Sequence, residues 1–95
     1  MTEKLTEALV ARLEYTPEGA ALVSGKLANL DAGLRPLLDA WLLQEAVKED
    51  VNIHGYSIAS LQEQYGMNFV AALLTLDWIC KTPEEAIPAI QEGIL

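Results

Sequence analysis

The sequence contains one cysteine and one histidine, and these low counts exclude several kinds of site. A structural zinc site takes four Cys or His ligands, which one copy of this chain does not have, so we expect no metal and no cofactor. An intramolecular disulfide needs two cysteines and is excluded for the same reason. A single cysteine is typical of a protein from a reducing compartment, and we therefore expect a cytoplasmic location.

Basic residues are also scarce, because six Lys and Arg stand against 14 Asp and Glu and leave a formal net charge of −8. The field of such a chain repels the phosphates of nucleic acids and anionic lipids. The strongest apolar run, residues 69–76, ends at Asp77 and is far shorter than the roughly 20 residues that span a bilayer. We therefore expect no direct nucleic-acid binding and no membrane association.

Hydrophobic residues are abundant, at 52% of the chain, and this content excludes intrinsic disorder. A chain of 95 residues is the size of one domain, so a single all-helical domain is expected over residues 1–95. The 16 Leu and 13 Ala are strong helix formers, and no segment shows sustained alternation of apolar and polar residues. The expected fold is all-α, a compact bundle of five or six short helices.

Two sequence signals mark helix starts, since Thr16-Pro17 and Thr82-Pro83 each place a hydroxyl before a proline that suits the first helical position. Glu85 follows Thr82 by three residues and completes the pattern of a capping box. Pro88 should kink or split the last helix. With the apolar periodicity, these signals predict helices over about 3–14, 17–31, 36–48, 58–65, 68–80 and from 83 onward.

The segment of about 68–80 is apolar on nearly every side, with only the strip of Asp77 and Lys81 clearly polar. A helix that is apolar all round is buried, so this one is predicted to be the centre of the bundle. Cys80 at its end should pack as a small apolar residue.

The third helix, over about 36–48, is also apolar in almost every direction along its first half. Either the other helices enclose Leu38, Trp41 and Leu42, or these residues form a contact with a second chain. Because small domains bury little surface and two-fold pairing is the commonest oligomer, we predict a homodimer with this contact as the subunit interface.

The connection over 50–56 has the most unusual composition of any loop in the chain. Gly55 suits a turn that requires positive φ. If the segment is extended, Val51 and Ile53 turn inward and the residues between them outward. The candidate ligand or partner contacts in this loop are Asn52, His54 and Tyr56.

Three functions follow from these observations, and no catalytic residue is assigned. We expect a protein–protein interaction or accessory module that acts as a homodimer and not as an enzyme. The outline of a helix-turn-helix over Ser57–Cys80 leaves open a regulator that needs a basic partner for nucleic acid. An enzyme centred on His54 and Tyr56, with the nearby carboxylates of 45–50 and with Cys80 as a candidate nucleophile, is the third possibility.

Overall fold

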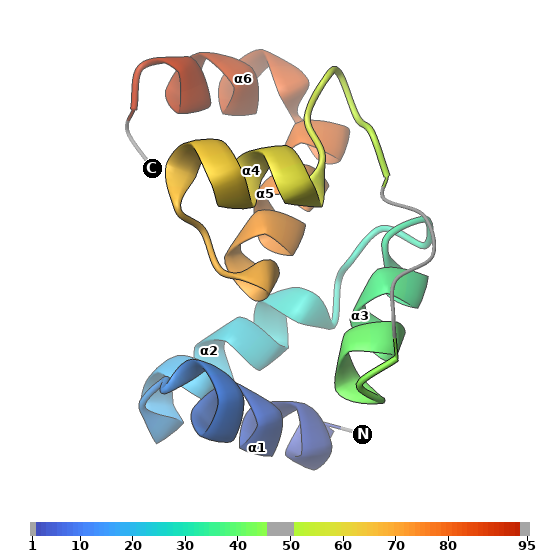
Figure 1. The fold of residues 1–95 in the computed structure, drawn as a ribbon, viewed down its shortest axis with the longest axis vertical. Helices are drawn as coiled ribbons and strands as arrows, with labels where there is room; N and C mark the ends of the chain where they lie inside the picture. The colour runs from blue at the N-terminus through green and yellow to red at the C-terminus, as the bar shows by residue number, and fades with distance from the viewer. Residues whose placement is uncertain (1, 46–50, 94–95) are drawn as a thin grey trace. The chain divides into compact units, whose positions relative to one another are not determined.

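The structure, a computed structural model, describes residues 2–45 and 51–93 of the chain (Figure 1). These residues form six helices and no strand, which confirms the all-α prediction. None of the helices in the described part of the chain has the length and apolar content needed to cross a lipid bilayer. The helices are α1 (Thr2–Leu13), α2 (Pro17–Leu27), α3 (Arg35–Leu42), α4 (Ile58–Tyr65), α5 (Phe69–Lys81) and α6 (Pro83–Gln91).

The chain divides into two compact units, Met1–Val47 and Lys48–Leu95, with three helices in each. The prediction of a single domain over residues 1–95 is not tested by this division and stays a prediction.

In the first unit, α1 packs against α2 and also contacts α3. A hydrogen bond of 3.0 Å joins Thr6 Oγ1 on α1 to Ser24 Oγ on α2, so the hydroxyl of the buried Ser24 is satisfied. The leucine spacing of residues 3–14 predicts that Glu3, Glu7 and Glu14 lie on the opposite, solvent-facing side, and all three are exposed. The buried apolar side chains of this unit are Leu5, Ala8, Leu9, Ala20, Leu27, Leu30, Leu34, Leu37 and Leu38.

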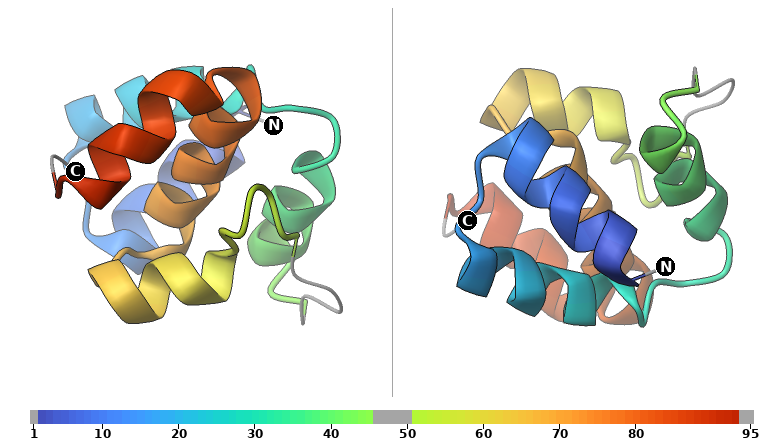
Figure 2. Two further views of the ribbon diagram at one scale, coloured as in Figure 1. Left: turned by 90° about the horizontal axis from the view of Figure 1, so that it is seen from above. Right: turned by 90° about the horizontal axis from the view of Figure 1, so that it is seen from below.

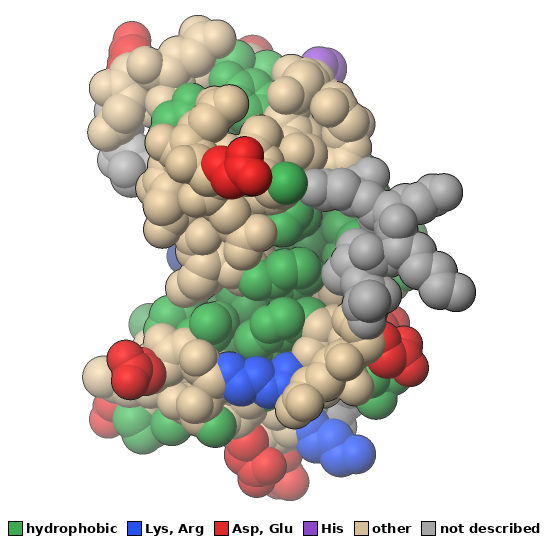
Figure 3. Space-filling model, in the orientation of Figure 1, with side chains coloured by type: hydrophobic (Ala, Val, Ile, Leu, Met, Phe, Trp, Pro, Cys, Tyr) green, Lys and Arg blue, Asp and Glu red, His purple; other side chains and the backbone are tan. Residues whose placement is uncertain are grey.

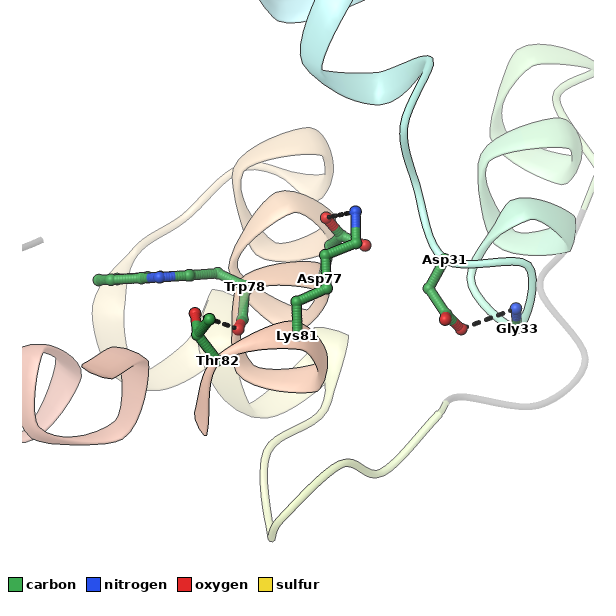
Figure 4. Close-up of polar contacts among 6 residues, drawn as sticks. All are labelled: Asp31, Gly33, Asp77, Trp78, Lys81 and Thr82. Atoms are coloured by element: carbon green, nitrogen blue, oxygen red, sulfur yellow. Dashed lines mark hydrogen bonds and ion pairs between the residues drawn. The ribbon is translucent and has the colours of Figure 1, made fainter. Parts of the chain in front are cut away.

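In the second unit, α5 packs against both α4 and α6 and lies between them (Figure 2). Seven of its 13 residues are buried, which confirms the prediction of a buried central helix within this unit. The polar strip of α5 is also as predicted, because Lys81 Nζ lies 2.9 Å from Asp77 Oδ2, one helical turn away (Figure 4).

Local capping by a side chain explains where three of the six helices of the described residues begin. Thr16 Oγ1 accepts a hydrogen bond from the Gly19 backbone N–H, and Asn68 Oδ1 accepts one from the Ala71 N–H. Ser57 begins α4 with a full capping box. Each of these starts depends on residues within four positions of one another, and such local spacings can be recognised in a sequence.

The capping box predicted at Thr82 and Glu85 is wrong. The Thr82 side chain does not cap α6, and its hydroxyl instead donates to the Trp78 carbonyl oxygen at 3.3 Å (Figure 4). The reason is that only one residue, Thr82, separates α5 from α6, so its hydroxyl lies within reach of the last turn of α5. Pro88 lies inside α6, which continues to Gln91, so the helix is not split there and a kink at Pro88 stays a prediction.

The third helix ends at Leu42 and not near residue 48 as predicted. Gln44 has φ of 59°, and its N–H donates to the Trp41 carbonyl while the Glu45 N–H donates to the Ala40 carbonyl. This pair of hydrogen bonds is a Schellman motif with glutamine at the position that usually takes glycine. The second helix is shorter too, since it ends at Leu27 and not near residue 31.

Two further predictions about burial are wrong. The apolar spacing of Ile58, Leu61 and Tyr65 in the sequence predicts that all three face inward, but Tyr65 is 42% exposed, because α4 ends there and Gly66 turns the chain away with φ of 67°. Cys80, expected to pack as an apolar residue, is exposed in the last turn of α5.

Candidate functional site

A groove of about 820 Å³ lies between α1 and α3 of the first unit. Its apolar lining consists of Ala8 and Ala11 from α1, Leu42 at the end of α3, and Leu43, the C-cap residue of α3. Small side chains on one wall and large ones on the other leave room between the helices, and only a few residues of α1 and α3 touch directly. The groove therefore offers a concave apolar surface of the kind that binds a ligand or a partner side chain.

Charged residues of both signs form the rest of the lining. Lys4, Glu7 and Arg12 come from α1, and Asp39 comes from α3. Two cations and two anions sum to zero, in a chain whose net charge is −8. On the face of the first unit drawn in Figure 3, Lys and Arg side chains lie close to apolar and acidic ones. The groove is thus locally neutral on a strongly acidic protein.

Arg12 joins the last turn of α1 to the end of α3. Its Nη1 donates a hydrogen bond to the Trp41 carbonyl oxygen, and its Nη2 donates one to the Leu42 carbonyl at 3.0 Å. The guanidinium also lies over the Trp41 indole, 4.9 Å from the ring centroid. The last carbonyls of a helix lack partners within the helix and carry its negative dipole end, so a cation is stabilising there.

The residues predicted as a subunit interface fall in different environments. Leu38 is only 4% exposed and belongs to the core of the chain. Trp41 and Leu42 are half-buried, and the following Leu43 is 69% exposed. The interface prediction is not tested by these positions. The sequence pattern of the third helix did not single out Leu43 or the groove beside it, because the other wall of the groove belongs to α1.

The loop of the second unit forms a tight turn over Ile53–Tyr56. The Ile53 N–H donates to the Tyr56 carbonyl at 2.8 Å, and the Tyr56 N–H donates back to the Ile53 carbonyl at 2.9 Å. The two central residues, His54 and Gly55, both have positive φ, at 52° and 87°, as in a type I′ turn. Asn52 Oδ1 accepts the Gly55 N–H at 3.0 Å and fixes the turn further.

The extended conformation considered for this segment is not present, because His54 and Gly55 form a turn, but exposure still alternates from Val51 to His54. Asn52 and His54 are exposed, whereas Ile53 and Tyr56 are half-buried. The single histidine is visible at the surface in Figure 3. The role of Asn52, His54 and Tyr56 as ligand or partner contacts stays a prediction.

The enzyme hypothesis needs His54 within hydrogen-bond reach of Cys80 or of the nearby carboxylates. Within residues 2–45 and 51–93, no hydrogen bond joins His54 to Cys80, and no three His, Cys, Asp or Glu residues could share a metal ion. Of the carboxylates proposed near His54, Glu45 is exposed, while Glu49 and Asp50 lie outside the described residues.

The groups that a DNA-reading helix would need are engaged in local contacts. Asn68 caps the start of α5 through its side-chain oxygen. Lys81, at the other end of α5, pairs with Asp77. Both contacts are made within the chain, and the helix-turn-helix alternative stays a prediction.

Comparison of the chain with protein-family models, with curated proteins and with solved structures finds no match.

Proposed function

We propose that this chain is a protein–protein interaction or accessory module that acts as a homodimer. The observation that supports this function best is the position of Leu43, which is 69% exposed beside the apolar groove between α1 and α3. Burying a leucine completely is worth about 1.5–3 kcal/mol, so a partner that covers Leu43 gains a large part of that free energy.

Exposure alone does not make Leu43 informative, since Leu22 on α2 is 71% exposed and single exposed leucines are normal. The difference lies in the surroundings, because only Leu43 of these two lines the groove. An exposed apolar side chain next to an apolar concavity is the arrangement from which contacts between proteins are built.

The proposal is of a binding module without catalytic activity, and the single cysteine favours a cytoplasmic location. Sedimentation equilibrium tests the oligomeric state directly. We expect a dimer to form as the concentration rises from about 1 μM to about 100 μM, the range in which weak specific pairs associate. A chain that stays monomeric at the highest concentration would overturn the proposed function.

A further inference from the structure

We propose that the α1–α3 groove binds the same groove of a second copy of this chain, with Leu43 of each copy inserted between α1 and α3 of the other. This inference rests on the proposed function and assigns its surface. The occupant follows from three properties of the groove: its shape, its charge and the contacts of Arg12 that fix Leu43 in place.

The groove contains both kinds of surface that a two-fold contact needs. In a two-fold dimer the same patch serves on both copies, so it must contain both the projecting and the receiving surface. Leu43 projects from the end of α3, and the receiving surface is the apolar wall of Ala8 and Ala11 on α1. A patch with both elements can satisfy itself when a second copy is turned by 180°.

The charges are self-complementary as well. Two copies of a chain with a net charge of −8 repel each other over most of their surface. The lining of the groove, in contrast, contains Lys4 and Arg12 beside Glu7 and Asp39. A two-fold axis through this neutral patch allows cations of one copy to meet anions of the other. An anionic ligand would meet two carboxylates there, and a basic partner would meet two cations.

Arg12 fixes the end of α3, and with it one wall of the groove, relative to α1. Its hydrogen bonds to the Trp41 and Leu42 carbonyls hold the last turn of α3 against α1. Leu43 directly follows these carbonyls and is the C-cap residue of α3. Its position relative to α1 is therefore fixed before a second copy binds, which lowers the entropic cost of association.

Charge reversal with mixing tests the surface. Glu7→Lys makes the groove net positive, and Lys4→Glu makes it net negative. Each variant alone should have an apparent dimer dissociation constant weakened about tenfold or more, because like charges then face each other across the axis. An equimolar mixture should recover dimers, since the two grooves are then complementary. Glu18→Lys and Lys26→Glu, at exposed positions of α2, change the net charge by the same amounts and should leave association close to that of the parent.

Leu43→Asp should abolish dimers at concentrations where Leu22→Asp still forms them, and circular dichroism should show that both variants remain helical. The possible failures are distinct. A parent chain that is monomeric at about 100 μM removes the homodimer itself. If the parent is dimeric but the groove variants have the same dimer dissociation constants as their α2 controls, the groove is not the interface. The homodimer itself then stands.

Discussion

Arg12 contacts Trp41 through two different groups of the tryptophan, the indole ring and the main-chain carbonyl oxygen. The ring contact depends on the positive charge, whereas the hydrogen bonds to the Trp41 and Leu42 carbonyls depend on the planar, forked shape of the guanidinium. One exposed side chain thus stabilises the end of α3 and also fixes its distance from α1.

Replacing Arg12 should therefore weaken the first unit. Arg12→Ala removes the ring contact and both hydrogen bonds, and we expect the free energy of unfolding to fall by about 1–2 kcal/mol. Arg12→Lys keeps the charge but not the fork, so its loss should be smaller. Urea unfolding measures both, with Lys26→Ala as a control for removing an exposed cation. Equal stability of all three variants and the parent would show that the Arg12 contacts contribute nothing to folding.

Two glycines should respond to alanine in opposite directions. Gly25 lies inside α2 with no positive φ, whereas Gly66 ends α4 with φ of 67°. A Cβ at either position meets no atom within 4 Å, so packing does not distinguish the two substitutions. Gly25→Ala should raise the free energy of unfolding by about 0.5–1 kcal/mol, and Gly66→Ala should lower it by about 1–2 kcal/mol.

Thermal or urea unfolding of the two variants and the parent measures both changes in the free energy of unfolding. Each variant serves as the control for the other. Destabilisation by Gly25→Ala would contradict the open surroundings of that residue and would indicate that another surface approaches α2 closely there.

Thr16 and Thr82 share the same following residues, Pro and Glu, yet their hydroxyls differ in function. Thr16 Oγ1 accepts the Gly19 N–H at 3.1 Å, whereas the Thr82 hydroxyl does not cap α6. Thr16→Ala should therefore cost about 1 kcal/mol of stability, and Thr82→Ala clearly less. Thr16→Ser retains the cap and should restore most of the loss. Equal losses at Thr16 and Thr82 would contradict the difference between the two caps.

The same pair of threonines shows what the sequence could and could not predict. Helix type and several helix starts depend on residues within four positions of each other, so Thr16-Pro17 was sufficient to locate the start of α2. The end of α3 was missed because Gln44 takes the left-handed conformation that sequence rules assign to glycine. Thr82 was misread because its alternative partner, Trp78, belongs to the preceding helix.

The groove could not be predicted from the sequence, for a different reason. Its walls, α1 and α3, are separated by the whole of α2, and no local pattern fixes how two such helices meet. Arg12 looks like an ordinary surface cation until Trp41 is placed beside it. The loop at 50–56 was easier to predict, because Gly55 after an exposed polar residue indicates a tight turn by itself.

His54 offers the last test, because it can be replaced without disturbing the turn that holds it. Its φ of 52° is a conformation that asparagine adopts more readily than most residues, and Asn-Gly is the preferred pair for a type I′ turn. His54→Asn should therefore fold with unchanged or slightly higher stability while it removes the imidazole. Gly55→Ala, in contrast, should destabilise the turn by about 1–2 kcal/mol because its φ is 87°. The dimer proposed above uses the first unit only, so His54→Asn should also associate as the parent does in sedimentation equilibrium. Weaker association of a stable His54→Asn variant would move the subunit contact from the α1–α3 groove to the turn, because the backbone there is unchanged and only the imidazole is lost.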